Sequence, residues 1–183
     1  MFESDTAVGL PGSYAGERMT DILNALKTRR SVRTYTAEPV ESMIIEDIVD
    51  CARLAPTAMN EQPWEFVVIT GKDDLRRIPP MVGHAEFIAN AAFCILVLAR
   101  ASSCPVEDAC AATENLLLAA EAYGLGACWV AANQQAYAPV VAEAFGVPQE
   151  LRLISIVSAG HPAETTPRVD KRPLSEMLHW ERY

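Results

Sequence analysis

The chain has 183 residues, of which 50% are hydrophobic, and carries a formal net charge of −9 at pH 7. This length and apolar content suffice for one domain with a sizeable core. The acidic balance argues against nucleic acid and anionic membranes as partners, and no apolar run reaches the roughly 18 residues of a membrane span. We expect a cytoplasmic protein, because residues 1–19 lack the apolar segment of a signal peptide.

Helices and short strands alternate in the predicted chain. Residues 1–19 show no period and are expected to form a flexible tail, followed by a single domain over residues 20–183. Apolar spacing together with flanking Gly and Pro residues predicts the elements of that domain. The predicted helices cover residues 20–28, 41–54, 73–78, 106–123 and 138–145. The predicted strands cover residues 66–70, 93–98, 125–131 and 151–159.

The segment after Gly160 differs in composition from the rest of the domain. It is polar and contains prolines, and it has too little apolar content to fold alone. We therefore expect it to lie against another surface, for which a second subunit is one candidate.

Arginines are concentrated in the segment Arg29-Arg30-Ser31-Val32-Arg33. Guanidinium groups so close together repel one another unless an anion binds them, and the planar fork of an arginine matches phosphate oxygens. The preceding helix ends here with the negative end of its dipole, so side chains must hold the anion. The alternative is a solvated basic turn.

A polar loop, Pro56 to Trp64, joins a predicted helix to a predicted strand. Thr57, Asn60 and Gln62 can donate and accept hydrogen bonds without carrying charge. This chemistry suits the rim of a heterocycle with alternating C=O and N–H groups. The alternative is an ordinary connection with local side-chain to backbone bonds.

Gly124 and Gly126 precede an aromatic strand that contains Trp129. The glycines would let the backbone approach a ligand, although a helix cap and a tight turn explain them equally well. They follow a helix rather than open one, so they do not form a dinucleotide fingerprint. Five scattered cysteines without a CxxC pair predict reduced thiols and no metal site.

In their order and spacing these motifs resemble the nitroreductase family of FMN-dependent oxidoreductases. The resemblance covers residues 20–175. The matching segments are Arg29–Arg33, Ala55–Trp64, Glu114–Ala120 leading into Gly124–Trp129, and Gly160–Pro162 followed by Arg172.

The resemblance implies an α+β fold with a central mixed, mainly antiparallel sheet flanked by helices. It also implies an obligate homodimer with FMN at the subunit interface, where the C-terminal tail reaches over the partner. By resemblance, Arg29, Ser31 and Arg172 hold the phosphate and ribityl chain. Arg33 and Arg30 approach the N1 and C2=O side of the ring, where a cation raises the flavin potential.

The same resemblance also assigns uncharged residues to the FMN pocket. Pro56 and Thr57 would come from the other subunit, Asn60 would bond the ring edge, and Gln62 lies in the same loop. The backbone of Trp129, Val130 and Ala131 would lie near the ring.

Three departures from the family pattern bear on substrate and donor choice. Thr57 stands where the family often has Ser. The chain is short and lacks the helical insertion that covers the pocket in longer members. No Pro-x-Glu-Gly motif follows Ala131, so the donor to flavin N5 has no clear motif.

The resemblance implies an enzyme that passes a hydride from NADH or NADPH through FMN to a nitroaromatic, quinone or similar acceptor. The scheme is ping-pong, and no side chain acts as nucleophile because the flavin carries the chemistry. Two alternatives remain open. One is a flavin-binding or sequestering protein without turnover, and the other is a flavin dehydrogenase or dehalogenase specific for one metabolite.

Overall fold

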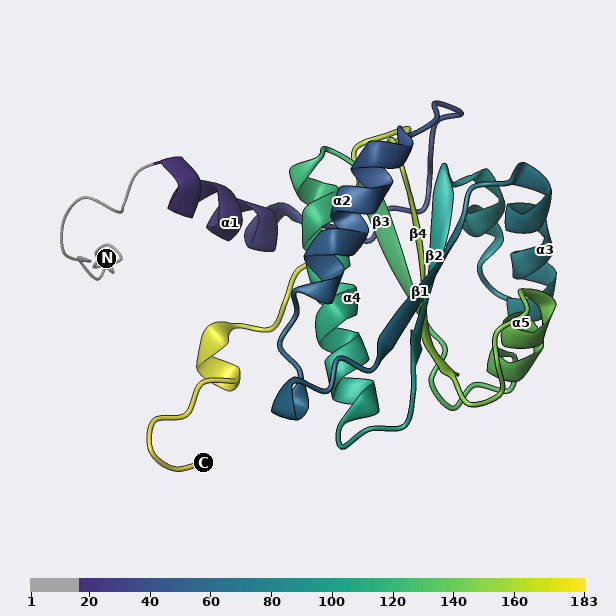
Figure 1. Cartoon of the computed structure of the whole chain (residues 1–183). Helices are drawn as coiled ribbons and strands as arrows, with labels where there is room; N and C mark the ends of the chain where they lie inside the picture. Colours follow the sequence, from purple (N-terminus) through teal and green to yellow (C-terminus); the bar gives the residue numbers. More distant parts are fainter. Residues whose placement is uncertain (1–16) are drawn as a thin grey trace.

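A four-stranded antiparallel sheet forms the centre of the fold (Figure 1). In the computed structural model, which describes residues 17–183, the order of strands across the sheet is β1-β2-β4-β3. The strands are β1 (Trp64–Ile69), β2 (Phe93–Ala99), β3 (Gly126–Ala131) and β4 (Arg152–Gly160). β1 and β3 are therefore the edge strands. One parallel bridge, between Ser31 and Ala127, adds the mixed character expected of the sheet.

Helices cover both faces of this sheet (Figure 1). On one face lie α2 (Ser42–Arg53) and α4 (Pro105–Ala122), and on the other lie α3 (Lys72–Val82) and α5 (Ala138–Ala144). Strand β2 is buried along its whole length because its alternate residues serve the two cores. Ile95 and Val97 pack with α2 and α4, whereas Leu96 and Leu98 pack with α3 and α5. The α+β fold expected from the sequence is confirmed.

Two predicted boundaries were wrong by more than two residues. The first helix, α1 (Glu17–Thr28), begins before Thr20, so residues 17–19 are helical rather than part of a tail; residues 1–16 of the predicted tail lie outside the described residues. The third helix does not stop at Ile78 but continues through Pro79 and Pro80 to Val82. Pro79 and Val82 are buried against the core, and this packing outweighs the backbone hydrogen bonds that the prolines remove.

Short 3₁₀ turns complete the structure: η1 (Ala58–Asn60), η2 (Glu86–Asn90) and η3 (Leu174–Glu176). The last of these lies in the C-terminal segment, which runs away from the sheet, as α1 does in a different direction (Figure 1). Among residues 17–183, no helix has both the length and the apolar character that a bilayer span requires.

Apolar side chains are exposed on both protruding segments. Trp180 in the C-terminal segment is 81% exposed, and the same segment exposes five more large apolar or aromatic residues, Val169, Leu174, Met177, Leu178 and Tyr183. On α1, Ile22, Leu23 and Leu26 are exposed as well. Exposed apolar residues concentrated in this way are typical of surfaces that pack against another molecule.

Gly126 tests how tightly the arginine segment packs on β3. A Cβ added there would come 2.6 Å from the side chain of Val32. We expect Gly126→Ala to lower the free energy of unfolding by about 1–3 kcal/mol through overpacking. Urea denaturation at fixed protein concentration measures this change.

The matched control for this prediction is the double variant Val32→Ala with Gly126→Ala. Removing the two methyl groups of residue 32 relieves two of the three 2.6 Å contacts with the new Cβ and leaves only the contact with the Cβ of residue 32, so the double variant should lose less stability than the sum of the single variants. Additive losses would show that the two side chains do not compete for the same space.

Candidate functional site

The arginine segment runs along the outer edge of β3. The Val32 N–H donates to the Ala127 carbonyl at 3.0 Å, and a second bridge joins Tyr35 to Pro162. Val32 and Tyr35 are buried, and the Tyr35 hydroxyl donates to the Val32 carbonyl at 2.7 Å. Burial raises the pKa of Tyr35 above its ordinary value, so this hydroxyl stays a donor. The segment is therefore fixed in an extended conformation against the sheet.

Arg29 and Arg33 both act electrostatically on Cys128. Burial raises the pKa of the Cys128 thiol, and the positive charges of Arg33 and Arg29 partly offset that rise. Arg29 Nε lies 3.7 Å from Glu114 Oε1 on α4. Arg33 lies over the ring of Phe87, 5.8 Å from its centroid, and donates to the Ser31 carbonyl at 3.3 Å. Most donors of both guanidinium groups remain available to a ligand.

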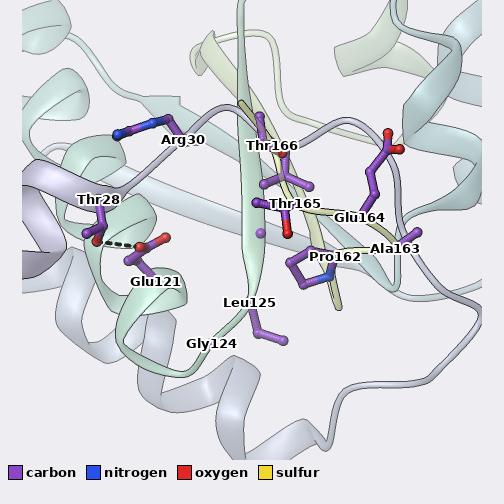
Figure 2. A pocket seen from close by; sticks show the side chains of 12 residues that line it. Thr28, Arg30, Glu121, Gly124, Leu125, Pro162, Ala163, Glu164, Thr165 and Thr166 are labelled. Atoms are coloured by element: carbon purple, nitrogen blue, oxygen red, sulfur yellow. Dashed lines mark hydrogen bonds between the residues drawn. The ribbon is translucent and has the colours of Figure 1, made fainter. Parts of the chain in front are cut away.

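Arg30 is separated from the other two arginines. Its guanidinium donates to the backbone carbonyls of Lys27 at 2.9 Å and Arg29 at 2.7 Å. Arg30 lines a cavity of about 530 Å³ between the ends of α1 and α4 and residues 162–166 (Figure 2). Arg33 lines a different cavity. Extended backbone explains this separation, because successive side chains point to opposite sides.

The cavity beside Arg30 is poorly suited to an anion. The Thr28 hydroxyl donates to the Glu121 carboxylate across it at 2.8 Å (Figure 2). Glu164 lines the same cavity, but its carboxylate accepts from the Thr34 hydroxyl at 3.1 Å and points away from Arg30 (Figure 2), so Glu121 is the carboxylate that counters an anion there.

The cavity beside Arg33 lies at the open edge of β3. It measures about 410 Å³, and its lining residues are Arg33, His84, Phe87, Cys128, Trp129, Val130, Ala131, Gln135 and Tyr137. The Val130 side chain is buried in the core of α3 and α5, so its contribution here is backbone. Ala131 is exposed.

Backbone groups of β3 point into this cavity. Val32 bonds the Ala127 carbonyl from outside the sheet, and the Ala132 N–H donates inward to Ile154 on β4 at 3.0 Å. Since the direction alternates along a strand, Trp129 and Ala131 point their N–H and C=O groups outward. The Tyr137 hydroxyl bonds the Ala131 carbonyl, which fits this assignment. The edge thus offers two main-chain donors beside a cation.

The loop from Pro56 to Pro63 lies far from the arginine segment in the same chain. Three strand spacings, or roughly 14 Å, separate the edge strands β1 and β3. Along the strands, Trp64 is level with Ala99, whereas Ala127 is level with Phe93, which adds roughly 20 Å. One chain therefore does not bring Pro56, Thr57, Asn60 and Gln62 to the arginine segment.

The remaining predicted residues are distributed as follows. Asn60 and Gln62 are exposed, and the Gln62 side chain donates to the Asn60 carbonyl at 3.3 Å. The Thr57 hydroxyl is engaged within its own chain, where it donates to Asp108 at 2.7 Å. Arg172 is exposed on the C-terminal segment.

Sequence reasoning missed Asp108. This carboxylate is 5% exposed and sits in the first turn of α4. In the sequence it looks like one of the acids that commonly begin a helix. A pattern search along the chain could not find it, because its partners Thr57 and Ala58 are about fifty positions away.

The sequence of this chain matches a known protein family and individual proteins within it. The model of the Nitroreductase family matches residues 26–85 and 80–161. A protein of Archaeoglobus fulgidus, provisionally named NADH dehydrogenase/NAD(P)H nitroreductase, is 33% identical over 174 residues, which are 90% of this chain and 100% of that protein.

Solved structures agree with the sequence matches. A Bacteroides thetaiotaomicron protein with the same provisional name has a TM-score of 0.84 and 30% identity, covering 88% of this chain and 98% of that one. An FMN-dependent nitroreductase from Clostridium difficile R20291 has a TM-score of 0.80 and 26% identity, covering 88% and 99%. The chain belongs to the nitroreductase family.

Proposed function

We propose that two copies of this chain hold FMN between them and pass a hydride from NADH or NADPH to a nitroaromatic, quinone or similar acceptor. The names of the relatives support the cofactor and the donor. The observation that carries the proposal is the cavity at the open edge of β3, where Arg33 and the outward backbone of Trp129 and Ala131 meet.

The residues around this cavity fit a flavin ring. The edge of the ring presents carbonyl oxygens and unprotonated nitrogens, which need donors. The N–H groups of Trp129 and Ala131 and the guanidinium of Arg33 are donors on one side of the same cavity. The Trp129 indole N–H is buried without a hydrogen-bond partner among residues 17–183, as expected of an incomplete site.

Arg29 and Ser31 continue the same face of the extended segment beyond Arg33. The single contact of Arg29 with Glu114 is long, so its donors are free to bind a phosphate with the help of the Ser31 hydroxyl. Arg172 would join them from the C-terminal segment. Arg30 faces the other cavity and is not part of this set.

When bound, FMN supplies the redox chemistry, accepting a hydride from the nicotinamide and giving it to the acceptor that follows in the same space. The protein holds the cofactor and adjusts its potential. A positive charge from Arg33 near N1 and C2=O would favour the negative charge that accompanies reduction. No nucleophilic side chain is required.

A second copy of the chain would complete the site. The arginine segment and the loop Pro56–Gln62 lie at opposite corners of one sheet, so the loop reaches a flavin only from a partner subunit. Exposed apolar residues on α1 and on the C-terminal segment supply surfaces for such a dimer. Obligate interfaces of this kind bury upwards of roughly 2,000 Å².

Bleaching under nitrogen separates an enzyme from a passive flavin carrier. We expect the purified protein to show flavin absorbance after reconstitution with FMN, and NADH or NADPH to bleach it within an anaerobic mixing experiment. Adding a nitroaromatic or a quinone should restore the colour. Bleaching by dithionite but by neither nicotinamide would support the binding module, and a colourless protein would refute the cofactor assignment.

Arg33→Ala should lower the flavin potential while FMN remains bound. Loss of one charged hydrogen bond costs about 1–3 kcal/mol, equivalent to about 20–60 mV for a two-electron couple. Arg29→Ala and Arg172→Ala should instead weaken FMN binding. Redox titration and FMN affinity measurements on the same preparations distinguish these effects.

Arg30→Ala is the matched control for these variants. It removes the same charge from the same segment but faces the other cavity, so potential and affinity should stay close to wild type. An Arg33→Ala protein with unchanged potential that loses FMN would reverse the two assignments.

A further inference from the structure

Asp108, in the first turn of α4, holds the loop Pro56–Pro63 by two hydrogen bonds. Its Oδ2 accepts from the Thr57 hydroxyl at 2.7 Å, and its Oδ1 accepts from the Ala58 N–H at 3.1 Å. Thr57 Oγ1 in turn accepts from the Gln62 N–H at 3.1 Å. A single buried carboxylate therefore connects the two ends of the loop through the Thr57 hydroxyl.

The backbone of this loop is strained. Met59, Asn60 and Gln62 have φ values of 51°, 57° and 48°, in the left-handed region. Asn tolerates this region, but Met and Gln adopt it only where the surroundings impose it. The bonds from Asp108 and Thr57 lie directly beside these residues and supply that constraint.

A second contact fastens the loop to the same part of the chain. The Glu61 carboxylate accepts from the Ser103 N–H at 2.7 Å and from the Ser103 hydroxyl at 3.0 Å. Ser103 lies just before α4, so both contacts hold the loop to the segment that leads into this helix. The apex then projects outward, with the Met59 side chain 89% exposed.

We propose that Asp108 is a positioning residue for the FMN pocket, acting through Thr57 and Ala58 on the loop that each subunit presents to its partner's flavin. This inference rests on the proposed function. Burying a carboxylate is costly, and an apolar residue could fill the same space more favourably. The arrangement is explained by the fixed loop geometry that it maintains, which lowers the ordering cost of cofactor binding.

Two substitutions at residue 57 test this role. Thr57→Val keeps the shape of the side chain but loses the hydroxyl that joins Asp108 to Gln62, whereas Thr57→Ser keeps that hydroxyl. We expect Thr57→Val to weaken FMN binding by about 10–100-fold, by analogy with the loss of metal affinity when the outer-shell partners of metal-binding residues are removed. Its flavin potential and visible circular dichroism should also change. Thr57→Ser should retain wild-type values.

Glu107→Gln is the matched control on the helix side. Glu107 is an exposed carboxylate in the same turn of α4, and its loss should leave affinity, potential and dichroism unchanged. Should Thr57→Val fail to fold, Asp108→Asn undergoes the same measurements, since it keeps the side-chain shape and one acceptor oxygen.

The outcomes are distinguishable. If Thr57→Val or Asp108→Asn lowers the melting temperature of the apoprotein but leaves FMN affinity, potential and dichroism as in wild type, the role is merely structural and the inference is overturned. A wild-type protein that takes up no FMN overturns the proposed function and this inference with it. Wild-type binding with unchanged variants overturns the inference alone.

Discussion

The close packing of Val32 on Gly126 determines on which side of the extended segment Arg30 and Arg33 lie. Only a residue without a Cβ fits at position 126, because that atom would come 2.6 Å from the Val32 side chain. With Val32 directed inward, the extended segment must direct its neighbours Ser31 and Arg33 the other way. Arg33 thereby reaches the open edge of β3, and Arg30 is directed to a separate cavity.

The antiparallel topology imposes the second constraint. β1 and β3 are opposite edges of the sheet, and the polar loop precedes one while the arginine segment flanks the other. Within one chain, neither the length of the polar loop nor the reach of its side chains can span the distance from the loop to the arginine segment. A pocket that uses both segments therefore requires two copies, and the uncovered apolar residues of α1 and the C-terminal segment are consistent with that requirement.

Much of this organisation could be predicted from the sequence. The burial pattern of β2 and the stripe of α2 follow from apolar spacing, and the α+β fold followed from ordered motifs that resemble a known family. Local patterns could not show that α3 continues through Pro79 and Pro80, since tertiary packing decides that. They could not separate Arg30 from Arg33 either, because the separation depends on which side of an extended segment faces β3.

The Asp108 contact shows the same limit more clearly. An acidic residue in the first turn of a helix is common. Asp108 matters because the fold brings Thr57 and Ala58 of the polar loop within hydrogen-bond distance of its carboxylate. The sequence indicated that Thr57 was polar and available to a ligand, whereas the structure engages its hydroxyl within the chain. Other side chains of the loop are exposed, among them Met59, Asn60 and Gln62, of which Gln62 donates to the Asn60 carbonyl.

A mixed dimer tests the shared site most directly. One subunit would carry Arg29→Glu, and the other would carry Thr57→Val with Asn60→Leu; each homodimer should lose FMN. If arginines and loop come from different subunits, the mixed dimer has one intact site and regains half of the wild-type FMN content and of the NAD(P)H-dependent activity. A mixed dimer as empty as both homodimers would show that each chain builds its own site and would contradict the account.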